Sequence, residues 1–180
     1  MQKYSVFSLI KNAFTNHMNW EVAWKDPVPK KEYDVIIIGG GGHGLATAYY
    51  LAKEHKITNV AIIEKGWIGG GNVGRNTTII RSNFMYDANA RFNEFGMELW
   101  RNLSQELNFN VMFSPRGIIN LAHSDAQMNA YARRGNSMRL NGIDAKLLNR
   151  EEVKKHIPMA DFSDDVRFPI FGGLMQPSAG

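Results

Sequence analysis

A glycine-rich turn is the part of this sequence whose residue types and spacing most clearly predict chemistry. Residues 39–44 read GGGGHG and contain the pattern G-x-G-x-x-G. In a dinucleotide-binding unit the first glycine allows a tight exit from a strand, the second lets the backbone approach a pyrophosphate, and the third lets the helix pack on the strand. The helix that follows offers free N–H groups to phosphates. The predicted ligand-binding residues of this turn are Gly39, Gly41, Gly42, His43 and Gly44.

Glu64 is the second element of the motif, because it follows Gly44 by 20 residues. A carboxylate at this distance accepts hydrogen bonds from the ribose hydroxyls of an adenosine, and it disfavours the 2′-phosphate of NADP. The alternative is a glycine-rich turn without a ligand. Four adjacent glycines cost more conformational entropy than a simple turn needs. The spacing therefore predicts a site for the ADP half of a dinucleotide.

A long segment after Glu64 favours FAD over NAD as that dinucleotide. Residues 65–78, KGWIGGGNVGRNTT, have no periodicity, and long loops inside compact domains are usually functional. An NAD-binding domain usually continues from the acid into another helix, whereas this loop suits a more extended cofactor. Asn72, Asn76 and Thr77 offer hydrogen bonds to ribityl and phosphate oxygens. A disordered surface loop is the alternative.

The elements around the turn predict a Rossmann-type α/β fold. Residues 33–38 form an apolar run that indicates a parallel strand buried on both faces. Helical spacing follows over 45–55, and a second short strand over 60–63. Such a βαβ unit is joined by a right-handed crossover. We expect residues 33–85 to form an FAD-binding unit with its flavin loop.

The segments on either side of this unit have different predicted roles. Residues 1–32 are expected to be an extension and linker, with an amphipathic lead-in helix over 1–20; docking of that helix on a partner or a membrane surface is the alternative. Tyr4, Phe7, Ile10 and Phe14 lie on one face of that helix. Residues 86–180 are expected to begin a mixed-sheet α+β substrate domain.

Within that domain the pattern predicts helices over 88–107 and 125–140, the second capped by Ser124 or Asp125. A β-hairpin is predicted from 111–113 and 117–121, a capping box at Asn149 and Glu152, and a further strand over 167–171. The final GGLMQPSAG is expected to contain no closing strand.

Composition excludes several classes of site. The sequence has no cysteine, so disulfides and thiolate sites are absent from these 180 residues, which fits a cytoplasmic protein. The net charge of +4 is spread along the chain without the basic stripe typical of nucleic-acid binding. The apolar run 35–38 is too short to span a membrane.

The sequence resembles the FAD-dependent amine and amino-acid oxidoreductases of the D-amino-acid-oxidase-like group, and within it the beta subunits of heterotetrameric sarcosine oxidases. The resemblance lies in residues 33–72, in RNTTIIRSN, in FSPRGIINLAH and in the terminal QPSAG. It implies noncovalent FAD and oxidation of the N-methyl group of sarcosine, to glycine and formaldehyde or methylene-tetrahydrofolate. It also implies alpha, gamma and delta partner subunits. On the flavin side it implies roles for Asn72, Arg75, Asn76, Thr77 and Ile79, and Lys65 is a further expected cofactor-binding residue.

Arg81 matches the arginine of that group that faces a substrate carboxylate, and a planar guanidinium suits bidentate pairing. A structural salt bridge is the alternative. The resemblance also implies a covalent FMN on a histidine beyond Gly180, so we expect a truncated chain. Other hypotheses are a flavin dehydrogenase for dimethylglycine, another imino acid or a glycerol phosphate, and a noncatalytic FAD-binding fragment.

Overall fold

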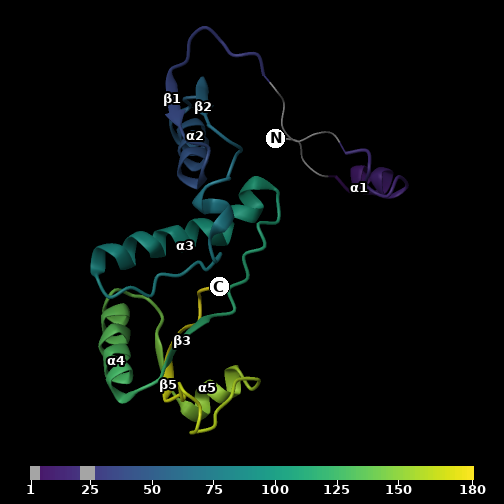
Figure 1. The fold of residues 1–180 in the computed structure, drawn as a ribbon. Coiled ribbons are helices and arrows are strands. Elements are labelled where there is room, and N and C mark those ends of the chain that lie inside the picture. The colour runs from purple at the N-terminus through teal and green to yellow at the C-terminus, as the bar shows by residue number, and fades with distance from the viewer. Residues whose placement is uncertain (1–4, 21–26) are drawn as a thin grey trace. The chain divides into compact units, whose positions relative to one another are not determined.

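The structure, a computed structural model, describes residues 5–20 and 27–180 and divides them into two compact units. The first unit comprises the described residues of Ser5–Thr78 and the second comprises Ile79–Gly180. Figure 1 shows the order of the elements along the chain. The predicted α/β fold class is confirmed, because the first unit has a parallel βαβ arrangement and the second combines helices with a sheet.

Helix α1 (Val6–Ala13) is the first described element, and it is shorter than the helix predicted over residues 1–20. Its N-terminus is capped by Ser5, whose hydroxyl accepts a hydrogen bond from the Ser8 amide at 3.1 Å. Residues Asn16 and His17 have positive φ, which ends helical geometry soon after Ala13. Tyr4 and residues 21–26 lie outside the described residues.

The βαβ unit consists of β1 (Val35–Ile38), α2 (Gly42–His55) and β2 (Val60–Ile63). The strands are parallel, with Val35 opposite Val60 and Ile38 opposite Ile63. Helix α2 begins three residues earlier than predicted, directly inside the glycine turn. The motif glycines therefore form part of the helix start, which is the geometry that a phosphate-binding turn requires.

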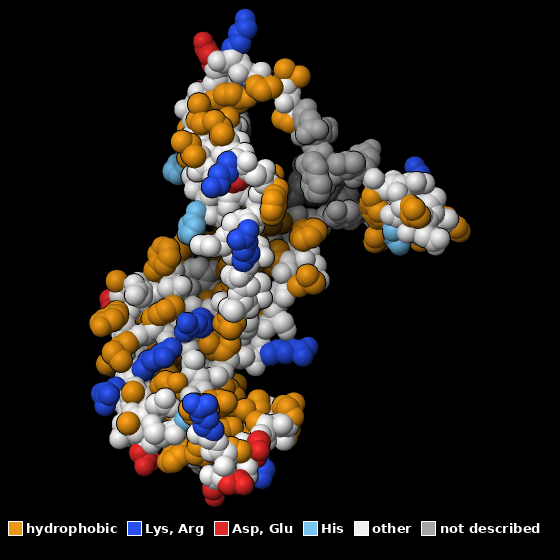
Figure 2. Space-filling view, in the orientation of Figure 1, with side chains coloured by type: hydrophobic (Ala, Val, Ile, Leu, Met, Phe, Trp, Pro, Cys, Tyr) orange, Lys and Arg blue, Asp and Glu red, His pale blue; other side chains and the backbone are white. Residues whose placement is uncertain are grey.

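The expectation that the first strand is buried on both faces is wrong for this structure. Val35 and Ile37 are half-buried, but Ile36 is 57% exposed and Ile38 is 89% exposed. Within this unit a two-stranded sheet and a single helix can cover only one sheet face. Figure 2 shows hydrophobic side chains at the surface over β1 and β2, while Lys and Arg side chains are scattered over the visible face.

The second unit contains three helices and three strands, and its sheet is antiparallel with the order β3-β5-β4. Strand β5 is central, with Leu174 opposite Asn120 on one side and Leu147 on the other. The elements are α3 (Asp87–Leu107), β3 (Ile118–Ala122), α4 (Asp125–Leu140), β4 (Lys146–Asn149), α5 (Arg150–His156) and β5 (Gly172–Gln176).

Three strand predictions in this unit are wrong. Residues 111–113 form no strand, so the predicted hairpin is absent, and residues 167–171 are also irregular. The terminal segment, expected to lack a strand, contains the central strand β5. Its glycines allow close approach, since a Cβ at Gly172 would lie 2.4 Å from the Leu148 carbonyl oxygen. Glycines in a sequence usually indicate a turn, but here the missing side chain lets a neighbouring strand come close.

The predicted helix starts are confirmed by their caps. The Ser124 hydroxyl accepts from the Gln127 amide at 3.2 Å at the start of α4. At α5 the capping box is complete, because Asn149 Oδ1 accepts from the Glu152 amide at 2.9 Å and Glu152 Oε2 accepts from the Asn149 amide at 2.8 Å.

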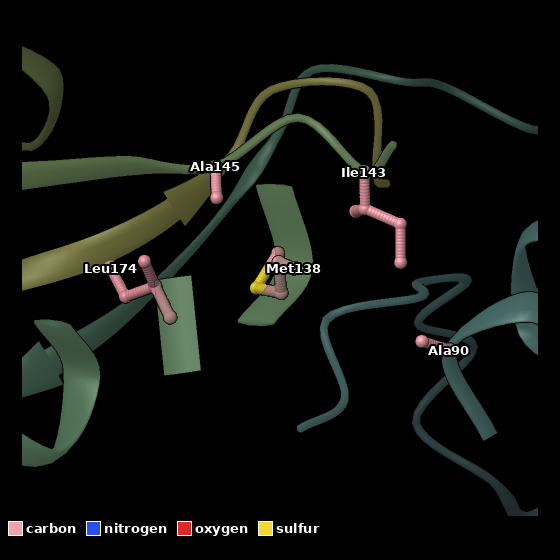
Figure 3. Close-up of a cluster of buried hydrophobic side chains, with 5 residues drawn as sticks. All are labelled: Ala90, Met138, Ile143, Ala145 and Leu174. Carbon is pink, nitrogen blue, oxygen red and sulfur yellow. The ribbon is translucent and has the colours of Figure 1, made fainter. Parts of the chain in front are cut away.

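The core of the second unit lies on both faces of β5. Leu174 packs toward α4, and Figure 3 shows Met138 of α4 between Leu174 and Ile143. Met175 belongs to a second cluster around Leu148, Val153 and Ile170, on the side of α5. Successive side chains of a strand point to opposite faces, so the central strand joins the two clusters. This arrangement fixes the C-terminal end of β5, from which the chain continues to Gly180.

Candidate functional site

The glycine turn requires glycine at its first and last motif positions. Gly39 has φ +105, a conformation that side chains disfavour, and its amide donates to the Ile63 carbonyl at 2.8 Å. A Cβ at Gly44 would lie 2.0 Å from the Gly39 carbonyl oxygen. The start of α2 therefore lies directly against the end of β1, as the motif predicts.

The middle of the turn is open. Gly41 is the N-cap of α2, no side chain caps the helix, and the first turn carries no acidic residue. A Cβ at Gly41 would meet nothing within 4 Å, whereas one at Gly42 would lie 2.8 Å from Val73 Cγ2. His43 is exposed, and its carbonyl accepts from the Thr47 hydroxyl at 2.7 Å. Uncapped amides with free space in front of Gly41 suit a bound anion.

Glu64 holds the turn from the end of β2. Its Oε2 accepts from the Gly40 amide at 2.7 Å, and its Oε1 accepts from the Gly66 amide at 2.9 Å. These two hydrogen bonds lower the pKa of the Glu64 carboxyl below its usual value, and the bond from Gly40 has the larger effect. Each carboxylate oxygen accepts more than one hydrogen bond, so capacity remains for ribose hydroxyls.

The segment after Glu64 is folded onto the turn, which rules out the disordered loop as its structure. The Gly69 amide donates to the Gly40 carbonyl at 2.9 Å, and the Gly74 amide donates to the Gly69 carbonyl at 3.0 Å. A short 3-10 helix, η1 (Asn72–Arg75), follows and brings Val73 close to Gly42. The predicted structureless segment therefore contains a compact loop.

The flavin-side residues lie in and just after this loop. Asn76 caps it, since its amide nitrogen donates to the Val73 carbonyl at 2.5 Å and its Oδ1 accepts from the Thr78 amide at 2.6 Å. The remaining candidates are exposed: Lys65, Asn72, Arg75, Thr77 and Ile79. The structure thus brings Gly39–Gly44, Glu64 and the loop together within the first unit.

Arg81 lies in the second unit and is half-buried. Its Nη1 donates to Asn83 Oδ1, and its guanidinium lies 5.0 Å from the centre of the Phe84 ring. The preceding residue is held by Gly180, because Ile80 and Gly180 exchange backbone hydrogen bonds of 2.7 and 3.0 Å. Arg81 forms no ion pair with any residue that the structure describes, so the predicted alternative of a salt bridge is not observed there.

A buried polar network beside Arg81 was not predicted from the sequence. Gln176 is fully buried, its Oε1 accepts from the Ser82 amide at 3.1 Å, and its Nε2 donates to the Ser82 hydroxyl at 2.7 Å. That hydroxyl donates to Glu94 Oε2 at 2.6 Å. Asn83, also fully buried, donates to Asn120 Oδ1 at 2.7 Å. The adjacent polar pair after Arg81, in an otherwise apolar stretch, was the available signal.

Metal-binding clusters and membrane-spanning helices are both absent from the described part of the chain. Residues 5–20 and 27–180 contain no group of three or more His, Asp or Glu that could hold a metal ion. Across the same ranges, no helix combines the length and the apolar character needed to cross a bilayer.

Comparisons with known proteins agree with this geometry. The family described as DAO, FAD dependent oxidoreductase, matches residues 34–180. Sarcosine oxidase subunit beta of Rhizobium meliloti is 60% identical over 178 residues, 99% of this chain and 42% of that protein. The Rhodobacter capsulatus protein of the same name is 51% identical over the whole chain and 43% of its own length. The chain thus spans about two fifths of these relatives.

Among solved structures, L-proline dehydrogenase from P. horikoshii superposes with a TM-score of 0.73 and 31% identity, over 85% of this chain and 38% of that protein. Glycine oxidase from Bacillus cereus has a TM-score of 0.70 at 22% identity, over 83% and 39%, and shows the fold alone. The glycine turn, its acidic partner and the match over residues 34–180 lead to one conclusion: the chain belongs to the FAD-dependent oxidoreductase family.

Proposed function

We propose that this chain is part of an oxidoreductase subunit that oxidises the N-methyl group of sarcosine. The products are glycine and formaldehyde, or methylene-tetrahydrofolate when tetrahydrofolate accepts the one-carbon unit, together with hydrogen peroxide. The observation that carries this proposal is the 60% identity over 178 residues to a sarcosine oxidase beta subunit. Because the chain spans 42% of that relative, we assign the activity to the assembled enzyme, which we place in the cytoplasm.

The first unit is proposed to bind the ADP half of FAD. The amides at Gly41, Gly42 and His43 would receive the pyrophosphate, because the helix start is uncapped and open. Glu64 would accept from the adenosine ribose with the lone pairs that Gly40 and Gly66 leave unused. The remaining proposed FAD contacts of this unit are Gly39, Gly44 and Lys65, with Asn72, Arg75, Asn76 and Thr77 on the flavin side; Ile79, the first residue of the second unit, is a further proposed flavin-side contact.

The second unit is proposed to orient the substrate through Arg81. When bound, FAD would supply the two-electron acceptor for the N-methyl C–H bond. The task of the protein is then to place the amine, and a guanidinium that pairs with no acid among the described residues suits the substrate carboxylate. Stacking on Phe84 and the bond to Asn83 hold that guanidinium in one orientation.

A multisubunit assembly is the proposed context. Alpha, gamma and delta subunits would accompany this one, and a covalent FMN would lie on a histidine outside these residues. Helix α1 supports a partner. It lies outside the family match at 34–180 but inside the matches to the Rhizobium meliloti and Rhodobacter capsulatus beta subunits, which leave at most two residues of this chain unaligned. Phe7 and Phe14 are 83% and 87% exposed, so we propose that another subunit of the oxidase covers them.

Oxidation of a different N-substituted amino acid, such as L-proline or dimethylglycine, is the second candidate. L-proline dehydrogenase from P. horikoshii is 31% identical over 85% of this chain, and proline, like sarcosine, joins a secondary amine to a carboxylate. The proposed FAD site at Gly39–Gly44 and Glu64, and the proposed carboxylate contact of Arg81, would serve both substrates. Discrimination would depend on the pocket around the nitrogen substituent.

The two candidates are separated by substrate-dependent flavin reduction. The assembled flavin-loaded enzyme is mixed without oxygen with sarcosine, dimethylglycine or L-proline, and the loss of flavin absorbance is followed. Fast reduction by sarcosine, with glycine as product, is the expected result. Reduction by L-proline or dimethylglycine with no response to sarcosine would reject the first candidate in favour of the second.

A further inference from the structure

Two arginines converge on one buried residue in the second unit. Arg81 Nη1 donates to the side-chain Oδ1 of Asn83, and Arg134 Nε of α4 donates to the Asn83 carbonyl at 2.7 Å. Asn83 is fully buried and is itself held by Asn120 at 2.7 Å. Arg134 reaches Asn83 across 51 positions of the sequence and thus places a second guanidinium group on the same short segment.

Aromatic rings hold both guanidinium groups in place. Arg81 lies 5.0 Å from the Phe84 ring centre, and Arg134 lies 5.9 Å from the Tyr131 ring centre. The Tyr131 hydroxyl donates to the Leu121 carbonyl at 3.2 Å, which fixes the ring under Arg134. Each arginine therefore has a stacked, hydrogen-bonded orientation and does not move as freely as a surface side chain.

Neither positive charge is neutralised by the described residues. The carboxylate in the adjoining network, Glu94, accepts from Ser82 and pairs with Arg101 at 3.4 Å. No acidic residue in 5–20 or 27–180 pairs with Arg81 or Arg134. Burial lowers the pKa of Arg134, and the neighbouring charge of Arg81 lowers it further. Two like charges in a partly buried place are unfavourable unless an anion joins them.

We propose that Arg134 is a second anion-binding residue, which together with Arg81 binds the carboxylate of the amino-acid substrate. This inference rests on the proposed function and extends it from one arginine to two. Arg134 donates to Asn83 through Nε alone, so both of its Nη groups remain as donors for a ligand. Arg81 donates to Asn83 through Nη1, so its Nη2 and Nε groups remain as donors. A guanidinium pair selects a carboxylate over a neutral group at the same position, so it would set specificity for amino acids over simple amines.

The test compares substrates with and without a carboxylate. Arg134→Gln is introduced into the assembled flavin-loaded oxidase, and flavin reduction is measured with sarcosine and with N-methylethanolamine, in which a hydroxymethyl group replaces the carboxylate. The exposed neighbour Arg133 on the same helix provides the matched control, Arg133→Gln. We expect Arg134→Gln to raise the KM for sarcosine by roughly tenfold or more while leaving N-methylethanolamine unchanged. Arg133→Gln should leave both substrates at wild-type values.

Each result bears on the inference. If Arg134→Gln retains FAD and the ratio of kcat/KM for the two substrates stays at the wild-type value, Arg134 does not bind the carboxylate. If Arg134→Gln loses FAD, the same ratio is measured on Arg134→Lys, which keeps the positive charge but lacks the planar guanidinium group. A few-fold fall in kcat/KM for sarcosine relative to N-methylethanolamine supports the inference, and an unchanged ratio overturns it. A wild-type enzyme whose flavin sarcosine does not reduce would instead reject the proposed function.

Discussion

The backbone amide of Gly40 lies 2.7 Å from Oε2 of Glu64, while the Gly40 carbonyl accepts from Gly69 at 2.9 Å. The residue proposed to bind the ribose is therefore also the residue that holds the phosphate turn. Its carboxylate links the end of β2 to the turn after β1. The loop through Gly69 bonds the carbonyl of the same residue, Gly40. If Glu64 binds the ribose as proposed, cofactor binding and the order of the turn are coupled through Gly40.

Substitution of Glu64 should weaken FAD binding in two steps. Glu64→Gln keeps one acceptor oxygen but removes the charge, whereas Glu64→Ala removes both hydrogen bonds to the turn. We expect FAD affinity to fall by about tenfold in the glutamine variant and further in the alanine variant. Titration of the apoprotein with FAD measures this, with the exposed Glu54→Ala on α2 as control. Equal affinity in all four proteins would contradict the ribose role.

The Glu64 carboxyl should also make the turn sensitive to acid. Its pKa is lowered in the folded state, so its stabilising contribution is fully present above the pKa of the unfolded chain and is lost as the pH falls through the folded value. We expect the difference in unfolding midpoint between wild type and Glu64→Gln to be constant near neutral pH and to shrink below about pH 4. Urea unfolding at several pH values tests this, and a difference that persists at pH 2 would refute it.

Alanine substitutions at two glycines of the turn should have different effects. Gly44→Ala places a Cβ 2.0 Å from the Gly39 carbonyl oxygen and should destabilise the unit itself. Gly41→Ala meets nothing within 4 Å, and its φ of −83 suits alanine, so the protein should fold normally. The added methyl group would instead occupy the space of the pyrophosphate. Thermal unfolding combined with FAD titration separates the effects, and a Gly41→Ala variant with normal FAD affinity would show that the phosphates lie elsewhere.

Arg81→Lys should impair substrate binding more than folding. Lysine keeps the charge but loses the planar fork that Asn83 and Phe84 orient. In the assembled enzyme we expect a KM for sarcosine roughly tenfold higher, with flavin content unchanged. Steady-state kinetics with sarcosine measures this, and Arg116→Lys, at an exposed position of the same unit, is the control. Wild-type kinetics would reject Arg81 as the carboxylate anchor.

Removal of the exposed rings of α1 should weaken subunit assembly without affecting the fold. Phe7 and Phe14 contribute little buried surface in this chain, so Phe7→Ser and Phe14→Ser together should leave its thermal stability within about 0.5 kcal/mol of wild type. Co-purification with the other subunits should fall, because apolar anchors carry much of an interface's energy. Lys11→Ala on the same helix is the control. Full recovery of the complex with the double variant would exclude this helix as the contact.

Local patterns were sufficient for the cofactor turn and the helix starts. Gly39, Gly44 and Glu64 lie within one βαβ unit, where the chain spacing and the right-handed crossover leave little freedom. The caps at Ser124 and Asn149 depend on residues three positions away, so they could be predicted from sequence alone.

Only the tertiary structure decided the rest. Strand β5 contains two glycines and no clear alternation, and it becomes a strand because β3 and β4 approach it from both sides. Arg134 reaches Asn83 across 51 residues, and Gln176 reaches Ser82 across 94. Such pairs have no periodicity in the sequence, because they form when distant segments bury one surface together. The sequence by itself determined the cradle for a dinucleotide, whereas packing of the second unit decided which charges meet beside Arg81.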